Sequence, residues 1–371
     1  MTVTLGRVVT ALDAAYPPAL AESWDAVGLV CGDPDDEVRT ALVCVDVTDA
    51  VVEQALATGA DLIVAHHPLL LRGVESVAAS TPKGRLIHRL ITGGCALYSA
   101  HTNADKVRGG VSDALAETLG VHDTVPLQPE PVAPLDKWVV MVPEGSAEQV
   151  TEAMFRAGAG AIGDYRDCMW GVVGTGQFLP VDGADPTIGA VGDLTRVDEE
   201  RVELVAPRGL RARVLAALRA AHPYEEPAFD VFAQAALDSD VGLGRVGRLA
   251  EPMPLREFTA HAARALPSAP WGIRAAGDPD ALVTTVAVCG GAGDSLIGAA
   301  AVAGADVYVT GDLRHHVVDE ALRAGGPALI DAGHWATEFP WCVSAAELLA
   351  ENGCAATVFQ PPTDPFNVVP S

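Results

Sequence analysis

Residues 41–65 read ALVCVDVTDAVVEQALATGADLIVA, and residues 286–310 read VAVCGGAGDSLIGAAAVAGADVYVT. The two stretches share a spacing, because Cys44 and Cys289 each precede a Gly-Ala-Asp triplet by the same interval. Each copy is typical of a buried strand, a helix of small residues, a turn led by glycine and a second buried strand. This order predicts a βαβ unit in a parallel sheet that is covered on both faces.

The similarity continues beyond the second strand. The first copy runs on to GGCALYSAHTNAD (93–105), and the second runs on to GGPALIDAGHWATE (325–338). Each copy ends in a His that is followed four residues later by a carboxylate: His101 and Asp105 in the first, His334 and Glu338 in the second. Chance similarity of two alanine-rich segments is the alternative explanation. Because ligand-bearing loops lie at the carboxyl ends of strands in open α/β sheets, we expect these side chains to mark a site.

The middle of the chain, about residues 130–245, matches neither copy. It opens with the proline-rich stretch PLQPEPVAP (126–134), which suits a semi-rigid linker. A strand at 138–143, helices at 147–159 and 210–222, and further short strands predict a ferredoxin-like α+β module. The predicted fold class is therefore α/β, with two pseudo-symmetric α/β repeats that form one outer domain and a ferredoxin-like insert that interrupts them.

Composition excludes several classes of partner. The 371 residues include 24 Lys plus Arg and 49 Asp plus Glu, which gives a net charge of −25. A field of this sign repels nucleic acid and anionic membranes but not metal cations. No apolar run reaches the about 18 residues of a membrane helix, and no secretory leader is recognisable at the start. The seven Cys form no CxxC pair, so we expect reduced thiols and a cytoplasmic protein.

The adjacent pair His66-His67 stands where the buried strand DLIVA ends before Pro68. Neighbouring residues at a strand end point to opposite sides, so the two imidazoles could serve two different ions. A lone His in this position is more often a hydrogen-bonded structural residue. The pair gains weight from the two His-x-x-x-acid loops described above.

Five residues together form a mixed nitrogen and oxygen ligand set: His66, His67, Asp105, His334 and Glu338. Such a set suits two divalent transition-metal ions, namely Zn, Mn, Fe or Co, rather than Ca or Mg. Two such ions about 3.5–4 Å apart could generate a nucleophilic hydroxide and clamp a phosphoryl or carbonyl oxygen.

The second copy carries Gly311-Asp312 where the first has His66-His67, so the repeat is functionally asymmetric. Asp312 and His316 could orient ligands or move protons, although Asp312 could equally be a helix N-cap. His101 is open to two readings as well, as a residue that touches substrate or moves protons, or as one that supports the ligands.

Two further stretches carry less chemical information. HPYEEPAFDVF (222–232) holds a His and two acids, but its spacing favours a turn that leads into a strand. GLGRVG (242–247) has no following helix with an acidic partner, so no nucleotide-cofactor site is predicted.

Five separated motifs resemble those of a known family: SWDAVGL (23–29), AHHPL (65–69), SAHTNAD (99–105), TGDLRHH (310–316) and GHWATE (333–338). They are similar to the Nif-three-like (YqfO-type) dinuclear-metal-centre proteins, often labelled GTP cyclohydrolase I type 2 homologues. The resemblance implies the same five metal ligands, and it implies a toroidal homohexamer.

The resemblance also implies a domain division. It assigns the two halves of the Nif-three-like domain to residues 1–128 and 247–371, and a PII/CutA-like insert to residues 129–246. The chain departs from the family at Ala26, where Asn is frequent, and at His315, where Tyr is frequent. Neither position is among the implied ligands.

Two functions from different classes remain open at this point. The first is a metal-dependent hydrolase that acts on an unidentified small molecule, with a bridging hydroxide as nucleophile and His101 or His316 as proton shuttle. The second is a metal-handling or regulatory scaffold whose insert binds an effector or partner. A purely structural metal is a third reading. A fold and a metal do not choose a substrate.

Overall fold

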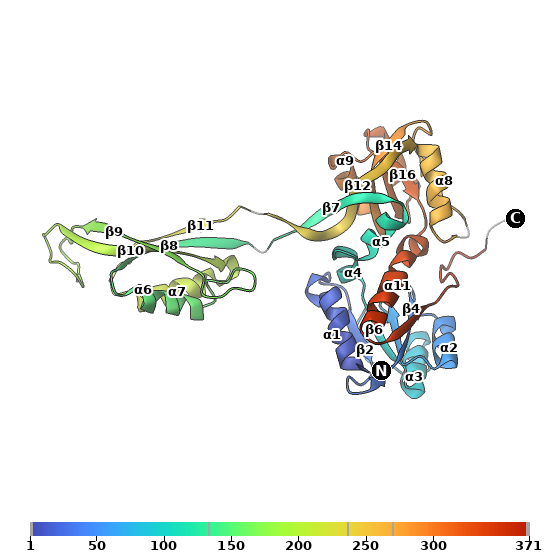
Figure 1. The fold of residues 1–371 in the computed structure, drawn as a ribbon, viewed down its shortest axis with the longest axis horizontal. Helices are drawn as coiled ribbons and strands as arrows, with labels where there is room; N and C mark the ends of the chain where they lie inside the picture. Colours follow the sequence, from blue (N-terminus) through green and yellow to red (C-terminus); the bar gives the residue numbers. More distant parts are fainter. Residues whose placement is uncertain (1–2, 133, 236, 269–270, 369–371) are drawn as a thin grey trace. The chain divides into compact units, whose positions relative to one another are not determined.

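The computed structural model describes residues 3–132, 134–235, 237–268 and 271–368. The chain forms two compact units, one of residues 1–130 with 239–371 and the other of residues 131–238 (Figure 1). The first unit contains two mixed sheets and a two-stranded ribbon of β1 (Val3–Thr4) and β3 (Glu37–Val38), and the second unit contains one antiparallel sheet.

The first sheet of the larger unit has five strands in the order β17-β4-β5-β6-β2. Its strands are β2 (Gly28–Cys31), β4 (Thr40–Cys44), β5 (Leu62–Ala65), β6 (Ala96–Ser99) and β17 (Ala355–Val358). All neighbours pair in parallel except the edge strand β2, which is antiparallel to β6. One face packs on α2 (Asp49–Thr58) and α3 (Pro82–Gly93), and the other on α1 (Leu5–Ala15) and α11 (His334–Glu351). Burial on both faces explains the uninterrupted apolar strands in the sequence.

The second sheet has six strands in the order β13-β16-β15-β14-β12-β7. Its strands are β7 (Val121–Pro131), β12 (Asp238–Pro254), β13 (Arg274–Ala276), β14 (Leu282–Ala292), β15 (Val307–Gly311) and β16 (Ala328–Asp331). The central strands β14, β15 and β16 are parallel, whereas β12 and β13 pair with them in antiparallel fashion.

Helices cover both faces of this second sheet as well. One face packs on α5 (Val111–Thr118) and α8 (Leu255–Ala265), and the other packs on α9 (Ile297–Val302) and α10 (His315–Arg323). The remaining short elements of this unit are η1 (Pro18–Leu20), α4 (Thr102–Lys106) and η3 (Asp294–Leu296). Helix α11 contacts strands of both sheets, so it joins the two halves of the unit (Figure 1).

The matched sequence stretches fold with the same local geometry. In both copies the glycine that begins the Gly-Ala-Asp triplet has φ near +69°, a left-handed conformation that glycine adopts without strain. The aspartate of each triplet then accepts a backbone hydrogen bond from the strand that precedes the helix. Asp61 Oδ2 accepts a hydrogen bond from the Thr40 backbone N–H at 3.0 Å, and Asp306 Oδ2 accepts one from the Thr285 backbone N–H at 2.8 Å.

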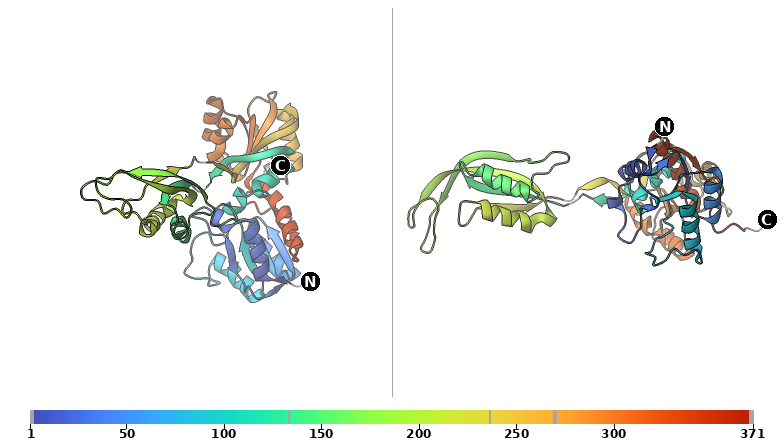
Figure 2. Two further views of the ribbon diagram at one scale, coloured as in Figure 1. Left: turned by 60° about the vertical axis from the view of Figure 1, so that its left-hand side comes forward. Right: turned by 90° about the horizontal axis from the view of Figure 1, so that it is seen from below.

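The smaller unit is a four-stranded antiparallel sheet in the order β11-β8-β10-β9. Its elements are β8 (Leu135–Pro143), α6 (Ala147–Arg156), β9 (Trp170–Phe178), β10 (Thr195–Pro207), η2 (Arg208–Leu210), α7 (Arg211–Ala221) and β11 (Phe229–Ala233). Helices α6 and α7 lie side by side on one face of the sheet (Figure 2). Together they bury a separate core around Trp138, which is fully buried.

The structure also bears on two expectations from composition. None of the helices in the described ranges combines the length and apolar character that crossing a bilayer would require. All seven cysteines lie in those ranges and are free, and the five buried ones all pack in the sheet cores.

Candidate metal centre

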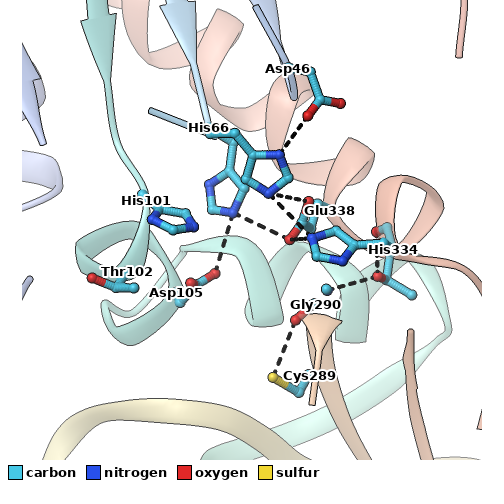
Figure 3. Close-up of polar contacts among 12 residues, drawn as sticks. Asp46, His66, His101, Thr102, Asp105, Cys289, Gly290, His334 and Glu338 are labelled. Carbon is cyan, nitrogen blue, oxygen red and sulfur yellow. Dashed lines mark hydrogen bonds and ion pairs between the residues drawn. The ribbon is translucent and has the colours of Figure 1, made fainter. Parts of the chain in front are cut away.

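The polar residues singled out above meet where the strands of the first sheet end. His66 and His67 directly follow β5, and His101 stands two residues beyond β6. His334 is the first residue of α11, and Glu338 lies one turn further along that helix. Figure 3 shows His66, His101, Asp105, His334 and Glu338 directed toward a common space. We refer to these five residues and His67 as the cluster.

His66 is fully buried, and one of its ring nitrogens is held by the backbone. Its Nδ1 lies 2.9 Å from the carbonyl oxygen of Ala100. Since a carbonyl can only accept, Nδ1 carries the hydrogen and Nε2 presents a lone pair. That Nε2 lies 3.7 Å from Asp105 Oδ1 and 3.5 Å from Glu338 Oε1, which are distances too long for a hydrogen bond.

His67 and His334 are oriented by carboxylates in the same manner. Nδ1 of His67 lies 2.7 Å from Asp46 Oδ1, and Nδ1 of His334 lies 2.7 Å from Asp312 Oδ2. Their two Nε2 atoms therefore face each other at 3.3 Å, and both approach Glu338, at 3.2 Å and 3.1 Å. A carboxylate behind the imidazole fixes its tautomer and raises its basicity, as is usual for metal-ligating His.

Charge is concentrated at this point. Burial alone would lower the pKa of His67 and of His334. The Glu338 carboxylate raises both pKa values, and so does the second carboxylate at each ring, Asp46 at His67 and Asp312 at His334. The pKa of His67 rises to about 11 and that of His334 to about 9. Burial also opposes the charge of Glu338, yet the three neighbouring imidazoles hold its pKa well below the usual range. The site therefore stabilises positive charge next to Glu338.

Two of the imidazoles sit at the end of a three-residue chain of hydrogen bonds. Thr363 Oγ1 donates to Asp46 Oδ2 at 2.5 Å, and Asp46 in turn holds His67. Thr102 Oγ1 donates to Asp25 Oδ2 at 2.5 Å, and Asp25 Oδ1 lies 2.8 Å from His101 Nδ1. Each threonine fixes the carboxylate that fixes the ring.

The ligand atoms satisfy a simple test for a cation. His66 Nε2 is buried and has no hydrogen-bond partner, which is costly unless another group binds it. Within the described residues, two groups place one ligand atom each within 4.8 Å of one another: His66, His67 and His101, and His67, His334 and Glu338. Imidazole nitrogens with carboxylate oxygens are the donors that Zn, Mn, Fe and Co prefer. The residues present fit a transition-metal ion.

Glycines make room for the cluster in the second copy. Gly291, at the end of β14, has φ of +63°, and a Cβ there would clash with Glu338 and crowd His334 Nε2. Gly311 stands where the first copy has His66, and a Cβ there would lie 2.8 Å from the His334 backbone nitrogen. The close approach of α11 thus explains why the second copy has a glycine in place of the first histidine of the pair.

Asp312 and His316, the two remaining predicted residues, lie differently with respect to the cluster. Asp312 holds His334 Nδ1, and the N-cap residue of α10 is Arg314 rather than Asp312. His316 is exposed on α10, and no hydrogen bond or ion pair of the described residues joins it to the cluster. Asp25 and Asp46 were not among the predicted residues. Asp46 follows the carboxyl end of β4, and Asp25 lies inside the quoted motif SWDAVGL, so both carried a signal.

A cavity of about 240 Å³ opens beside the cluster. His67 and His334 line it, together with the aromatic side chains of Trp271, Trp335 and Phe366. A small molecule could therefore reach the two imidazoles from this side.

Comparison with known proteins identifies the family. The family model described as Duf34/NIF3 (NGG1p interacting factor 3) matches residues 3–365. The chain belongs to the Duf34/NIF3 family. The family predicted from the five motifs is thereby confirmed, and the mixed α/β structure is similar to that of Duf34/NIF3 proteins.

Relatives of this chain match it from end to end. A Duf34/NIF3 relative from Mycobacterium tuberculosis named GTP cyclohydrolase 1 type 2 homolog is 58% identical and covers 99% of this chain and 98% of its own length. The solved Bacillus cereus protein related to NIF3 is 36% identical, covers 99% of both chains and has a TM-score of 0.68. Staphylococcus aureus protein SA1388 is 28% identical, again over 99% of both chains, with a TM-score of 0.79.

Proposed function

We propose that this chain is a metal-dependent hydrolase with a dinuclear centre, in which His66, His67, Asp105, His334 and Glu338 hold two divalent transition-metal ions. The observation that carries the proposal is the buried His66 Nε2, which has no hydrogen-bond partner and faces the same space as the other ligand atoms. When bound, Zn, Mn, Fe or Co would supply Lewis acidity and would activate water near neutral pH.

The residues of the chain would hold the metal ions and orient the imidazoles that bind them. Asp46 and Asp312 keep the Nδ1 atoms of His67 and His334 occupied, so their Nε2 atoms stay available. His101 is held by Asp25 and has a ligand atom within 4.8 Å of His66 and His67, which supports a role either in ligation or in moving a proton. His316, exposed on α10, would serve as proton shuttle only for a substrate that extends to that helix.

The reaction class rests on the relatives. Their printed name, GTP cyclohydrolase 1 type 2 homolog, implies hydrolysis of a carbon–nitrogen ring, and the ligand set is compatible with that chemistry. Fold and ligands alone do not choose the substrate.

The finer architecture belongs to the same proposal. The shared Gly-Ala-Asp geometry of residues 59–61 and 304–306 supports two pseudo-symmetric repeats. The strand order β11-β8-β10-β9, with two helices on one face, supports a ferredoxin-like, PII/CutA-like insert near residues 129–246 between domain halves 1–128 and 247–371. A homohexamer and a cytoplasmic location complete the proposal.

Elemental analysis of protein purified without added metal or chelator tests the centre. Wild type should carry about two transition-metal ions per chain. A His67→Ala, Glu338→Gln double variant should lose them, while His88→Ala, which removes an exposed His on α3, should keep them. Near-zero metal in wild type that Zn, Mn, Fe and Co all fail to restore would refute the proposal. With metal present, Glu338→Gln should abolish turnover of nucleotides or related ring compounds and leave the fold intact.

A regulatory or metal-handling scaffold is the second candidate, and one observation favours it. The smaller unit has its own core and a cavity of about 270 Å³ beside Tyr224. An effector bound there would raise the thermal stability of the smaller unit without altering metal content. This candidate would be excluded if the metal-loaded chain hydrolysed a substrate and no added ligand changed the thermal stability of the smaller unit.

A further inference from the structure

The cavity beside the cluster has a wall that the C-terminal segment builds. After β17, the Phe359 backbone N–H donates to the Val43 carbonyl at 2.8 Å, and Thr363 Oγ1 donates to Asp46. Phe366 then meets Trp271 edge to face, with ring centroids 5.6 Å apart and planes 79° apart. Residues 359–366 are thus fastened to the end of the first sheet and to Trp271, and we call them the C-terminal strap.

The wall offers aromatic surface that the protein itself does not cover. Phe366 is 70% exposed and Trp271 is 37% exposed, although both rings line the cavity. Aromatic side chains gain by packing against another planar ring in stacked or edge-to-face geometry. Exposed aromatic rings that flank a cavity next to a polar cluster are well placed to receive a planar ligand.

The polar groups on this wall accept hydrogen bonds. Asp364 is only 6% exposed, and its Oδ1 accepts the Phe366 backbone N–H at 2.9 Å. A carboxylate has two oxygens and accepts only, so Asp364 retains acceptor capacity toward the cavity it lines. No Lys or Arg stands among the described residues that line the cavity, and its basic groups are the imidazoles of His67 and His334.

We propose that this cavity binds a planar nitrogen heterocycle, with its ring against Phe366 and Trp271 and a ring N–H donated to Asp364. The inference deepens the proposed function, on which it rests, because it names the substrate class of the same site. It restricts that class to compounds whose planar ring occupies the space between the strap and the imidazoles of His67 and His334.

Calorimetric titration of the metal-loaded full-length chain tests this, with uracil and hypoxanthine as probes and 1,3-dimethyluracil as a probe that lacks N–H donors. Phe366→Ala should weaken uracil binding by about five-fold or more. Val368→Ala, which truncates a side chain that is 90% exposed two residues further on, should leave it unchanged. Asp364→Asn retains an acceptor for the Phe366 N–H, and it should weaken uracil binding several-fold without weakening 1,3-dimethyluracil.

Three outcomes would overturn the inference. The Phe366→Ala and Val368→Ala variants could bind uracil with equal affinity. 1,3-Dimethyluracil could bind wild type as tightly as uracil does. Neither uracil nor hypoxanthine could bind wild type at all. Thermal melting of each variant reports whether the strap still packs. Metal content is measured on the same samples, and because Trp271, Asp364 and Phe366 are not among the ligands, loss of metal and loss of ring binding are separate failures. Ring binding to wild-type protein that takes up none of Zn, Mn, Fe or Co would uphold the pocket and refute only the dinuclear centre.

Discussion

At the scale of single residues, threonine hydroxyls act on the cluster through carboxylates. Thr363 and Asp46 lie 317 positions apart in the chain, yet they form the hydrogen bond that holds the partner of His67. A hydroxyl that donates to one carboxylate oxygen leaves the other oxygen directed at the imidazole. Groups of this kind commonly tune metal affinity without touching the ion.

Thr363→Val removes the hydroxyl and keeps the shape of the side chain. Because Asp46 can then rotate away from His67, we expect metal affinity to fall by about three- to ten-fold, less than when a direct partner of a ligand is lost. Thr363→Ser should restore it, and Thr357→Val, the same change at an exposed site on β17, should have no effect. Competition with a chromophoric chelator measures the affinity. Equal affinity in Thr363→Val and wild type would show that Asp46 needs no such support.

At the scale of elements, the end of α7 in the smaller unit contains a buried histidine that must stay neutral. His222 Nε2 donates to the Met141 carbonyl at 2.9 Å, while its Nδ1 accepts the Tyr224 backbone N–H at 3.1 Å. Burial lowers the pKa of His222 below its ordinary value of 6.5. A proton added at Nδ1 would break the bond from Tyr224, which joins α7 to the turn before β11.

This arrangement predicts that the smaller unit loses stability in acid. The native unit binds fewer protons than the unfolded chain, so its stability is complete above about pH 6.5 and declines as the pH falls through the unfolded pKa toward the folded one. Amide hydrogen exchange in residues 134–235 of the full chain, measured between pH 8 and pH 5, reports this loss of stability. His222→Gln, which still can donate and accept, should flatten the dependence, and His122→Gln, at an exposed site on β7, should not. If the stability of the smaller unit still fell with pH as steeply in His222→Gln as in wild type, other titratable groups would be responsible.

At the scale of the whole molecule, assembly and metal binding can be separated. The proposed homohexamer predicts a particle of six chains by light scattering, and such assemblies have closed point-group symmetry. If the metal serves catalysis rather than assembly, chelation should remove the metal and leave the particle mass unchanged. The His67→Ala, Glu338→Gln variant should behave as chelated wild type does. Dissociation into single chains on chelation would point to a structural metal instead.

Much of the fold and part of the site follow from local sequence. Buried strands, the glycine turn after α2 and the four-residue spacing of His334 and Glu338 depend on neighbours within a few positions. Hydrophobic periodicity and turn chemistry act at this range, so the βαβ order and the candidate ligands were predictable. The pair His66-His67 likewise follows from one strand end and the proline after it.

The remaining features depend on contacts between distant residues. The approach of His67 and His334 spans 267 positions, and it requires α11 to pass between two sheets. No local pattern shows that Asp46, Asp25 and Asp312 stand behind three imidazoles, or that the strap forms the wall of a cavity. The sequence by itself determined which side chains were available and on which strand ends they stand. Only the tertiary structure decided which nitrogen of each imidazole faces the centre, because that choice is made by carboxylates and, for His66, a backbone carbonyl brought in from other parts of the chain.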